Sequence, residues 1–111
     1  MSSTPVDLER LNLITGGDEE MVRELVDLFV GDSTARIKGL AGLAQAGDRQ
    51  GLKRQIHAVK GASANMGATK LYEVCLSLEQ KAPTAETDDL LRHISEVEAA
   101  MDEATRILRG S

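Results

Sequence analysis

The residues of this chain whose types and spacing suggest chemistry are one histidine and its neighbours in the stretch QIHAVKGASANMG. His57 is followed three residues later by Lys60 and four residues later by Gly61. In a helix, these three positions lie on the same face. A neutral imidazole is a nucleophile, and a nearby ammonium group stabilises the oxygens of a phosphoryl group. The spacing therefore suggests phosphoryl transfer to His57, with Lys60 as its electrostatic support.

Gly61 is unexpected at this place, because a glycine inside a helix costs roughly 1 kcal/mol relative to alanine. It ends no helix, since the apolar pattern continues to Met66. The neighbouring side chains are also small, at Ala58, Ala62 and Ala64. We therefore expect Gly61 to provide clearance above the ring for a large phosphoryl donor, and the three alanines to belong to the docking surface.

Glu79 is the residue expected to orient the histidine. His57 lies eleven residues before Ala68, and Glu79 lies eleven residues after it. If the chain folds back at this turn, both residues lie about 16 Å from it, on helices about 8–10 Å apart. Glu79 would then accept a hydrogen bond from one ring nitrogen and leave the other exposed. The alternatives are that Glu79 pairs with Lys53 or Lys81, and that Lys60 is a solvated surface residue.

Charge is unevenly distributed along the chain. The net charge is −5, which argues against nucleic acid as the main partner. From residue 49 to 72, however, there is no acidic residue, and the basic ones are Arg49, Lys53, Arg54, Lys60 and Lys70. This segment is either a solvated helix face or a docking surface for an acidic partner, in which Lys53 and Arg54 lie next to His57.

The elements that must position these residues are helices. The 111 residues fit one domain, 1–111, and the hydrophobic period predicts helices at about 6–14, 18–46, 48–66, 69–82 and 87–109. Asp18 and Thr87 are the expected caps of the second and fifth helices, and a bend is expected near Gly31. Four substantial helices with short loops predict an all-α fold, an antiparallel up-down-up-down four-helix bundle with a short extra N-terminal helix.

Several classes of function are excluded by what the sequence lacks. It has no run of 18 apolar residues and no signal peptide, so we expect no membrane contact and a cytoplasmic location. A single cysteine, Cys75, excludes an internal disulfide and a cysteine zinc site, and we expect it in the core. The segment GASANMGATK lacks the ending of a phosphate loop, so the chain has no ATP site of its own. We expect no cofactor and no metal, and we expect His93 to be a surface residue.

The stretch HAVKGASANMGATKLYEVCLSLE resembles the signature of histidine-containing phosphotransfer (HPt) domains of two-component phosphorelays. The matching positions are His57, Lys60, Gly61, Gly67, Leu71, Cys75, Leu78 and Glu79. Upstream, GGDEEMVRELVDLF resembles the first bundle helix of the family, so the resemblance covers nearly the whole chain. It implies that His57 accepts the phosphoryl group, Lys60 stabilises it, Glu79 orients the ring and Gly61 gives clearance. Family members often have a hydroxyl residue where this chain has Ala62.

The resemblance also implies the partners. These are a response-regulator receiver domain, which holds a magnesium ion beside its aspartate, and a sensor or hybrid histidine kinase. The chain would be a phosphoryl carrier rather than an enzyme. Two alternatives remain: a non-catalytic helical bundle that docks a receiver domain or kinase, and the substrate domain of a chemotaxis-type kinase. We expect a monomer, because a single bundle leaves no extra apolar stripe, although a dimer through the first helix is the alternative. A free-standing protein and a domain of a hybrid kinase both fit the sequence.

Overall fold

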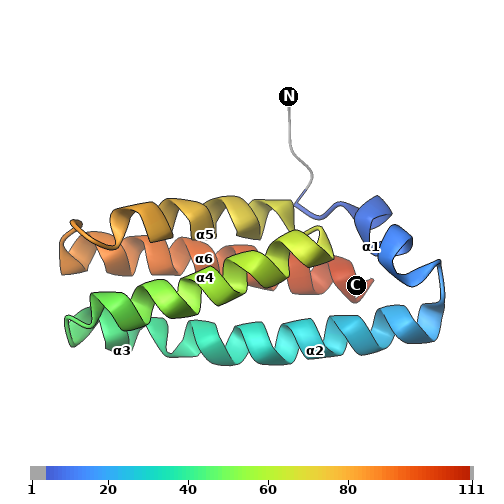
Figure 1. The fold of residues 1–111 in the computed structure, drawn as a ribbon, viewed down its shortest axis with the longest axis horizontal. Helices are drawn as coiled ribbons and strands as arrows, with labels where there is room; N and C mark the ends of the chain where they lie inside the picture. The colour runs from blue at the N-terminus through green and yellow to red at the C-terminus, as the bar shows by residue number, and fades with distance from the viewer. Residues whose placement is uncertain (1–4, 111) are drawn as a thin grey trace.

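The computed structural model describes residues 5–110, which form six helices and, within that range, no strand. Figure 1 shows the long helices running alternately in opposite directions, with the short N-terminal helix at the end of the bundle where the second helix begins. The predicted all-α four-helix bundle with an extra N-terminal helix is therefore confirmed. The helices are α1 (Leu8–Thr15), α2 (Glu19–Lys38), α3 (Leu40–Gln45), α4 (Arg49–Met66), α5 (Thr69–Lys81) and α6 (Thr87–Leu108).

The core lies between the four long helices, because α4 packs against α2 and α5, and α6 packs against the same two. On α4, the fully buried aliphatic residues are Leu52, Ile56 and Val59, at the spacing of four and three that the sequence predicted. His57 follows Ile56 and therefore points about 100° away from it around the helix axis, on the side away from the core. Packing of the aliphatic stripe thus rotates α4 so that the histidine faces outward. Within residues 5–110, no helix is both long enough and apolar enough to cross a membrane.

The prediction of one continuous helix over 18–46 is wrong. Gly31 lies inside α2 without a break, because the residues packed on the core around it hold the helix straight despite the low propensity of glycine. Those buried residues are Val26, Phe29, Ser33 and Ile37. The helix ends instead at Gly39, whose N–H donates to the carbonyls of Arg36 and Ile37. The following short helix α3 packs against α4 and α6 and leads the chain to the start of α4.

The residue predicted to cap the second helix does so in the structure, but the residue predicted to cap the last helix does not. The Asp18 side chain accepts hydrogen bonds from the N–H groups of Glu20 and Met21, as expected of an N-cap. Thr87 is not a cap, because it is already the first residue of α6, and Glu86 before it makes no side-chain capping bond.

The turn between α4 and α5 is fixed by Gly67. Its φ of 72° lies in the left-handed region, which favours glycine. Its carbonyl also accepts a hydrogen bond of 2.6 Å from the Asp7 N–H. A Cβ at this position would lie 2.5 Å from the Asp7 carbonyl oxygen. Glycine is therefore required twice, by the backbone conformation and by the close approach of the segment that leads into α1.

Candidate functional site

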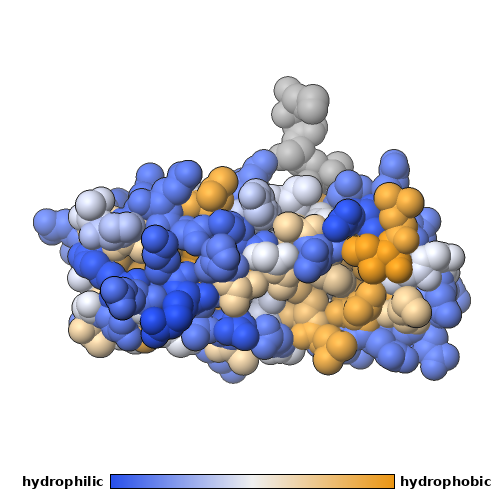
Figure 2. Space-filling view, viewed as in Figure 1, coloured by the Kyte–Doolittle hydropathy of each residue, from blue (hydrophilic) through white to orange (hydrophobic). Residues whose placement is uncertain are grey.

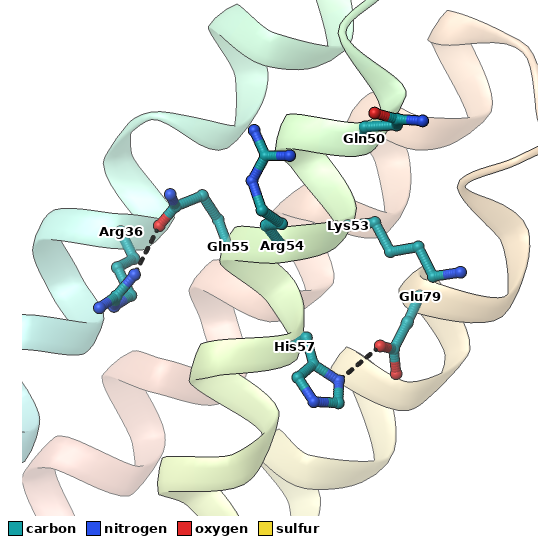
Figure 3. Close-up of a pocket in the computed structure, with 7 residues that line it drawn as sticks. All are labelled: Arg36, Gln50, Lys53, Arg54, Gln55, His57 and Glu79. Carbon is teal, nitrogen blue, oxygen red and sulfur yellow. Dashed lines mark hydrogen bonds and ion pairs between the residues drawn. The ribbon is translucent and has the colours of Figure 1, made fainter.

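His57 lies on the outer surface of α4, at its boundary with α5, and its ring points into solvent (Figure 3). Its side chain is 67% exposed, whereas that of Glu79 on α5 is only 12% exposed. The Nδ1 atom of His57 lies 2.8 Å from Oε2 of Glu79. The structure therefore contains the predicted contact between the two helices, made by an exposed ring and a largely buried carboxylate.

Lys60 is the second partner of the same carboxylate. Its Nζ lies 2.5 Å from Oε1 of Glu79, and its side chain is 18% exposed. Each oxygen of Glu79 thus holds one neighbour from α4. The alternatives left open by the sequence do not describe this arrangement, because Lys60 is not a solvated surface lysine and the ion pair of Glu79 is with Lys60 rather than with Lys53 or Lys81.

The charges of this cluster determine which ring nitrogen carries the proton. Burial alone raises the pKa of Glu79, but the hydrogen bonds from Lys60 and His57 outweigh it and bring the pKa below its usual value. The hydrogen bond to Glu79 raises the pKa of Lys60. Glu79 is therefore ionised at neutral pH, and an ionised carboxylate can only accept hydrogen bonds. Nδ1 must be the protonated nitrogen of a neutral ring, which leaves the lone pair of Nε2 available on the exposed side.

The surface next to the ring is low, as the small residues suggested. A Cβ built at Gly61 would meet no atom within 4 Å, so nothing inside the molecule requires glycine there. Ala64 is exposed, and Ala58 and Ala62 are partly buried. Ser63 is fully buried and donates to the Val59 carbonyl at 2.6 Å. It therefore does not supply the hydroxyl that family members often carry at the position of Ala62.

A groove of about 730 Å³ runs from His57 towards the start of α4 (Figure 3). Lys53 and Arg54, the basic residues predicted to dock a partner, line it and are exposed. The sequence reasoning missed Arg36, which reaches the groove from α2 and donates from Nη1 to Oε1 of Gln55 at 2.9 Å. No spacing rule could reveal this contact, because it depends on how α2 is rotated against α4. The groove is lined by Arg36, Gln50, Lys53, Arg54, Gln55, His57 and Glu79.

Two other residues singled out in the sequence lie away from this site. Cys75 is fully buried, as expected, and burial raises the pKa of its thiol to about 12, so it is not a reactive thiolate. His93 is less accessible than expected, because its side chain is only 19% exposed, and its Nδ1 lies 3.3 Å from Oε1 of Glu96 on the same helix. Among residues 5–110, no three His, Cys, Asp or Glu side chains cluster in a way that would hold a metal ion.

Comparison with known proteins gives consistent results. The model of the Hpt domain family matches residues 24–106. The solved structure of histidine-containing phosphotransfer protein B (HptB) from Pseudomonas aeruginosa has a TM-score of 0.87 and 31% sequence identity, over 98% of this chain and 95% of that one. The maize phosphotransfer protein ZmHP2 has a TM-score of 0.77 at 24% identity, over 96% of this chain and 86% of that one, and this likeness shows the fold alone.

The curated relatives are much longer proteins. The virulence sensor protein BvgS of Bordetella pertussis is 26% identical over 108 residues, which are 93% of this chain but only 9% of the sensor. The chain therefore spans less than a tenth of the curated relatives that it matches. Because the family model covers more than half of the chain, and a structure of the same class matches nearly all of it, the chain belongs to the Hpt domain family, the histidine-containing phosphotransfer carriers of two-component signalling.

Proposed function

We propose that Nε2 of His57 accepts a phosphoryl group from the aspartyl phosphate of a receiver domain, or from a histidine kinase, and passes it to the aspartate of a receiver domain. One observation carries this proposal. The ring is 67% exposed while its Nδ1 is held by an ionised, largely buried Glu79, so the free lone pair of Nε2 faces solvent. A nucleophile needs this combination of a defined tautomer and open access.

The transfer step is balanced without an additional proton carrier. The lone pair of Nε2 attacks phosphorus, the N–P bond forms, and the P–O bond to the aspartyl carboxyl group breaks, which leaves an aspartate carboxylate. The proton on Nδ1 stays where it is, and the ring becomes positively charged as the bond forms. Glu79 stabilises that charge through the 2.8 Å contact, which is the role of the carboxylate behind a catalytic imidazole. The reverse sequence returns the group to a carboxylate.

Lys60 has two functions in this proposal. One N–H of its ammonium group holds Oε1 of Glu79 at 2.5 Å, which fixes the carboxylate that orients the ring. An ammonium group has three N–H donors, so two remain for oxygens of the phosphoryl group. The magnesium ion that such transfers need is expected on the receiver domain, and this chain needs no cofactor and no ATP site of its own. A monomer and a cytoplasmic location remain our predictions.

The open surface at Gly61 supports a protein donor rather than a small one. Gly61 is exposed and no internal contact requires it, although it weakens the helix by roughly 1 kcal/mol. A partner that approaches closely over the ring explains why no side chain is present. The basic residues Lys53 and Arg54 line the groove that reaches His57 and are suited to the acidic, magnesium-binding pocket of a receiver domain.

The direct test is labelling of the purified chain by a phosphorylated receiver domain in the presence of magnesium. We expect label that is lost in acid and stable in base, as a phosphoramidate is, and we expect none on a His57→Gln variant that melts like the wild type. If receiver domains bind the chain but none of them labels it, the chain is a docking module instead. The association rate should also fall as salt rises, and a rate independent of salt would contradict the role of the basic residues.

A further inference from the structure

The short helix α1 carries more apolar side chains than the bundle covers. Leu11 packs into the core and is 5% exposed, but Leu8, Leu13 and Ile14 on the same helix are 55%, 81% and 42% exposed. Figure 2 shows hydrophobic side chains gathered over α1 and the adjoining part of α2. The expectation that a single bundle leaves no extra apolar surface is therefore wrong. A helix that is apolar on several sides is normally covered on each of them, so we expect a partner at α1.

Leu13 lies at a groove between α1, α2 and the end of α6. The groove consists of two hollows, of about 570 Å³ and about 400 Å³, which share Asn12 and Gly17 as lining residues. Leu13 lines the smaller hollow. The apolar residues that line the larger hollow are Val22, Val26 and Leu108. Each hollow has the size of an ordinary binding pocket, so apolar side chains of a partner fit into both.

The turn between α1 and α2 keeps the smaller hollow open. Gly16 and Gly17 both line it, and their φ angles of 65° and 81° lie in the left-handed region, which favours glycine. A Cβ at Gly16 would meet no atom within 4 Å. The turn therefore adds backbone but no side chain to the hollow, which leaves room for a partner beside Leu13.

The groove lies on a different side of the bundle from His57. The imidazole is at the boundary of α4 and α5, whereas the larger hollow is lined by α2 and the end of α6, together with Asn12 of α1. Because α4 and α6 each pack against α2 and α5, the boundary of α2 and α6 is opposite that of α4 and α5. No residue that lines the groove at His57 lines either of these hollows. We therefore expect a partner in this second groove to leave His57 accessible.

The part of the chain that forms this second groove is acidic. Residues 5–27 carry seven acidic and two basic side chains, a net charge of −5. Glu9 and Glu19 line the groove, and within the described part of the chain their side chains form no ion pair. Of the two arginines that line it, Arg109 already donates to Asp27, at 3.4 Å. The surplus carboxylates attract a positively charged partner.

This charge decides between the possible occupants. A second copy of the chain that used the same surface would bring an equal surplus of carboxylates against it. The reacting pocket of a receiver domain is acidic as well, and anionic membranes and nucleic acid also carry negative charge. The occupant that fits is a protein segment that combines an apolar face with lysine or arginine, which is the composition of a basic amphipathic helix.

We propose that the groove between α1, α2 and the end of α6 is a second docking site, which binds a basic amphipathic helix of a partner protein. Apolar side chains of that helix pack against Leu13 and Val22, and its lysines or arginines pair with Glu9 and Glu19. This inference does not rest on the proposed function, because no residue of the groove takes part in phosphoryl transfer. It gives the chain two surfaces of opposite charge that can be occupied at the same time.

Binding of a synthetic amphipathic helix built from leucine and lysine tests the apolar part of the site, by fluorescence anisotropy at low and at high salt. Leu13→Asn should weaken binding about tenfold at both salt concentrations, because burial of apolar area is not screened. Leu28→Asn is the matched control. Leu28 is 70% exposed but lines neither hollow, so its substitution should change binding by less than about twofold.

The same peptide tests the acidic part of the site. Glu19→Lys should weaken binding about tenfold at low salt, and the loss should shrink as salt rises. Glu73→Lys makes the same change in charge at an exposed position of α5, which lines neither hollow, and should stay within about twofold. His57→Gln should bind the peptide like the wild type, which keeps this test separate from the proposed function.

Several outcomes would overturn the second docking site. Absence of peptide binding to the wild type, or equal losses in a variant and its control, would show that the groove does not select a basic amphipathic helix. Competition between the peptide and a receiver domain would place the peptide at His57 instead. Dissociation of a dimer by Leu13→Asn in sedimentation would assign the apolar surface to a second copy. Thermal melts of each variant confirm that the bundle is intact.

Discussion

The two histidines of the chain are arranged in opposite ways, although Nδ1 of each lies next to a glutamate. At His57 the ring is 67% exposed and its glutamate is 12% exposed. At His93 the ring is 19% exposed and its glutamate is 57% exposed. The first pair joins two helices at 2.8 Å, and the second lies within one helix turn at 3.3 Å. In the first pair the carboxylate is largely buried and the ring is exposed, while in the second the ring is largely buried and the carboxylate is exposed.

The difference shows that a histidine next to a carboxylate does not by itself make an acceptor. Glu79 is also held by the ammonium group of Lys60 and is therefore a fixed support for the ring. Glu96 is largely solvated and has no such role in orienting a nucleophile. Glu79 comes from the neighbouring helix α5, whereas Glu96 lies on the same helix as His93. The four predictions below test this contrast, from the largest expected effect to the smallest.

The largest effect is expected from substitution of the two histidines. His57→Gln should abolish acid-labile label from a phosphorylated receiver domain, because the side chain of His93, the other histidine, is only 19% exposed. His93→Gln should be labelled like the wild type. Label on the His57→Gln chain would show that exposure and a buried carboxylate are not what selects the acceptor.

The next effect concerns the two glutamates. Glu79→Gln should slow phosphoryl transfer about 10- to 100-fold, since the amide neither fixes the tautomer nor stabilises the positive ring. Glu96→Gln should change the single-turnover rate by less than about twofold, as is usual for an exposed residue away from a site. Equal effects from the two substitutions would remove the distinction between a supporting and a solvated carboxylate.

Access to the ring should have a smaller effect. Gly61→Gln should slow transfer about tenfold, because a side chain would stand between the ring and its partner. Gly31→Gln is the control, since a Cβ at Gly31 also meets nothing within 4 Å and lies inside a helix. Both variants should unfold at a higher temperature, as replacement of a helical glycine by a better helix former predicts. If both variants transfer at the same rate, the clearance argument fails.

The smallest effect is on stability in acid. The pKa of Glu79 is below its usual value in the folded state, so its contribution is fully present above the unfolded pKa of about 4.3 and is lost as the pH falls through the folded pKa. Circular dichroism melts should therefore show the wild type more stable than Glu79→Gln near neutral pH, with a difference that shrinks in acid. A difference independent of pH would contradict the ionised Glu79. Glu96→Gln should follow the wild type throughout.

Much of the site could be predicted because it depends on counting along helices. His57, Lys60 and Gly61 lie within one turn of α4, and Glu79 is found by counting equal distances from one turn. These arguments need only the rise per residue and an antiparallel hairpin. The rotation of α4 also followed from its apolar stripe, which the structure shows buried.

The remaining features depend on how separate helices are rotated and packed. Arg36 reaches the groove only because its face of α2 lies against α4, which no pattern within α2 determines. A bend was expected near Gly31, but α2 continues through it to Lys38, because the core contacts on each side of Gly31 outweigh its local propensity. That Lys60 binds Glu79 as well as lying near the ring also required the relative position of two helices.

The turn at Gly67 affects the alignment of His57 and Glu79, although it lies about 16 Å from them. The turn at Gly67 fixes the registration of α4 against α5, and a shift of one residue would rotate Glu79 about 100° away from His57. The same turn is bonded to Asp7, ahead of α1. The alignment of His57 with the carboxylate that orients it, about 16 Å away, thus depends on a contact made by Asp7. We therefore expect a change at Asp7 that breaks this contact to alter phosphoryl transfer without touching a residue of the site.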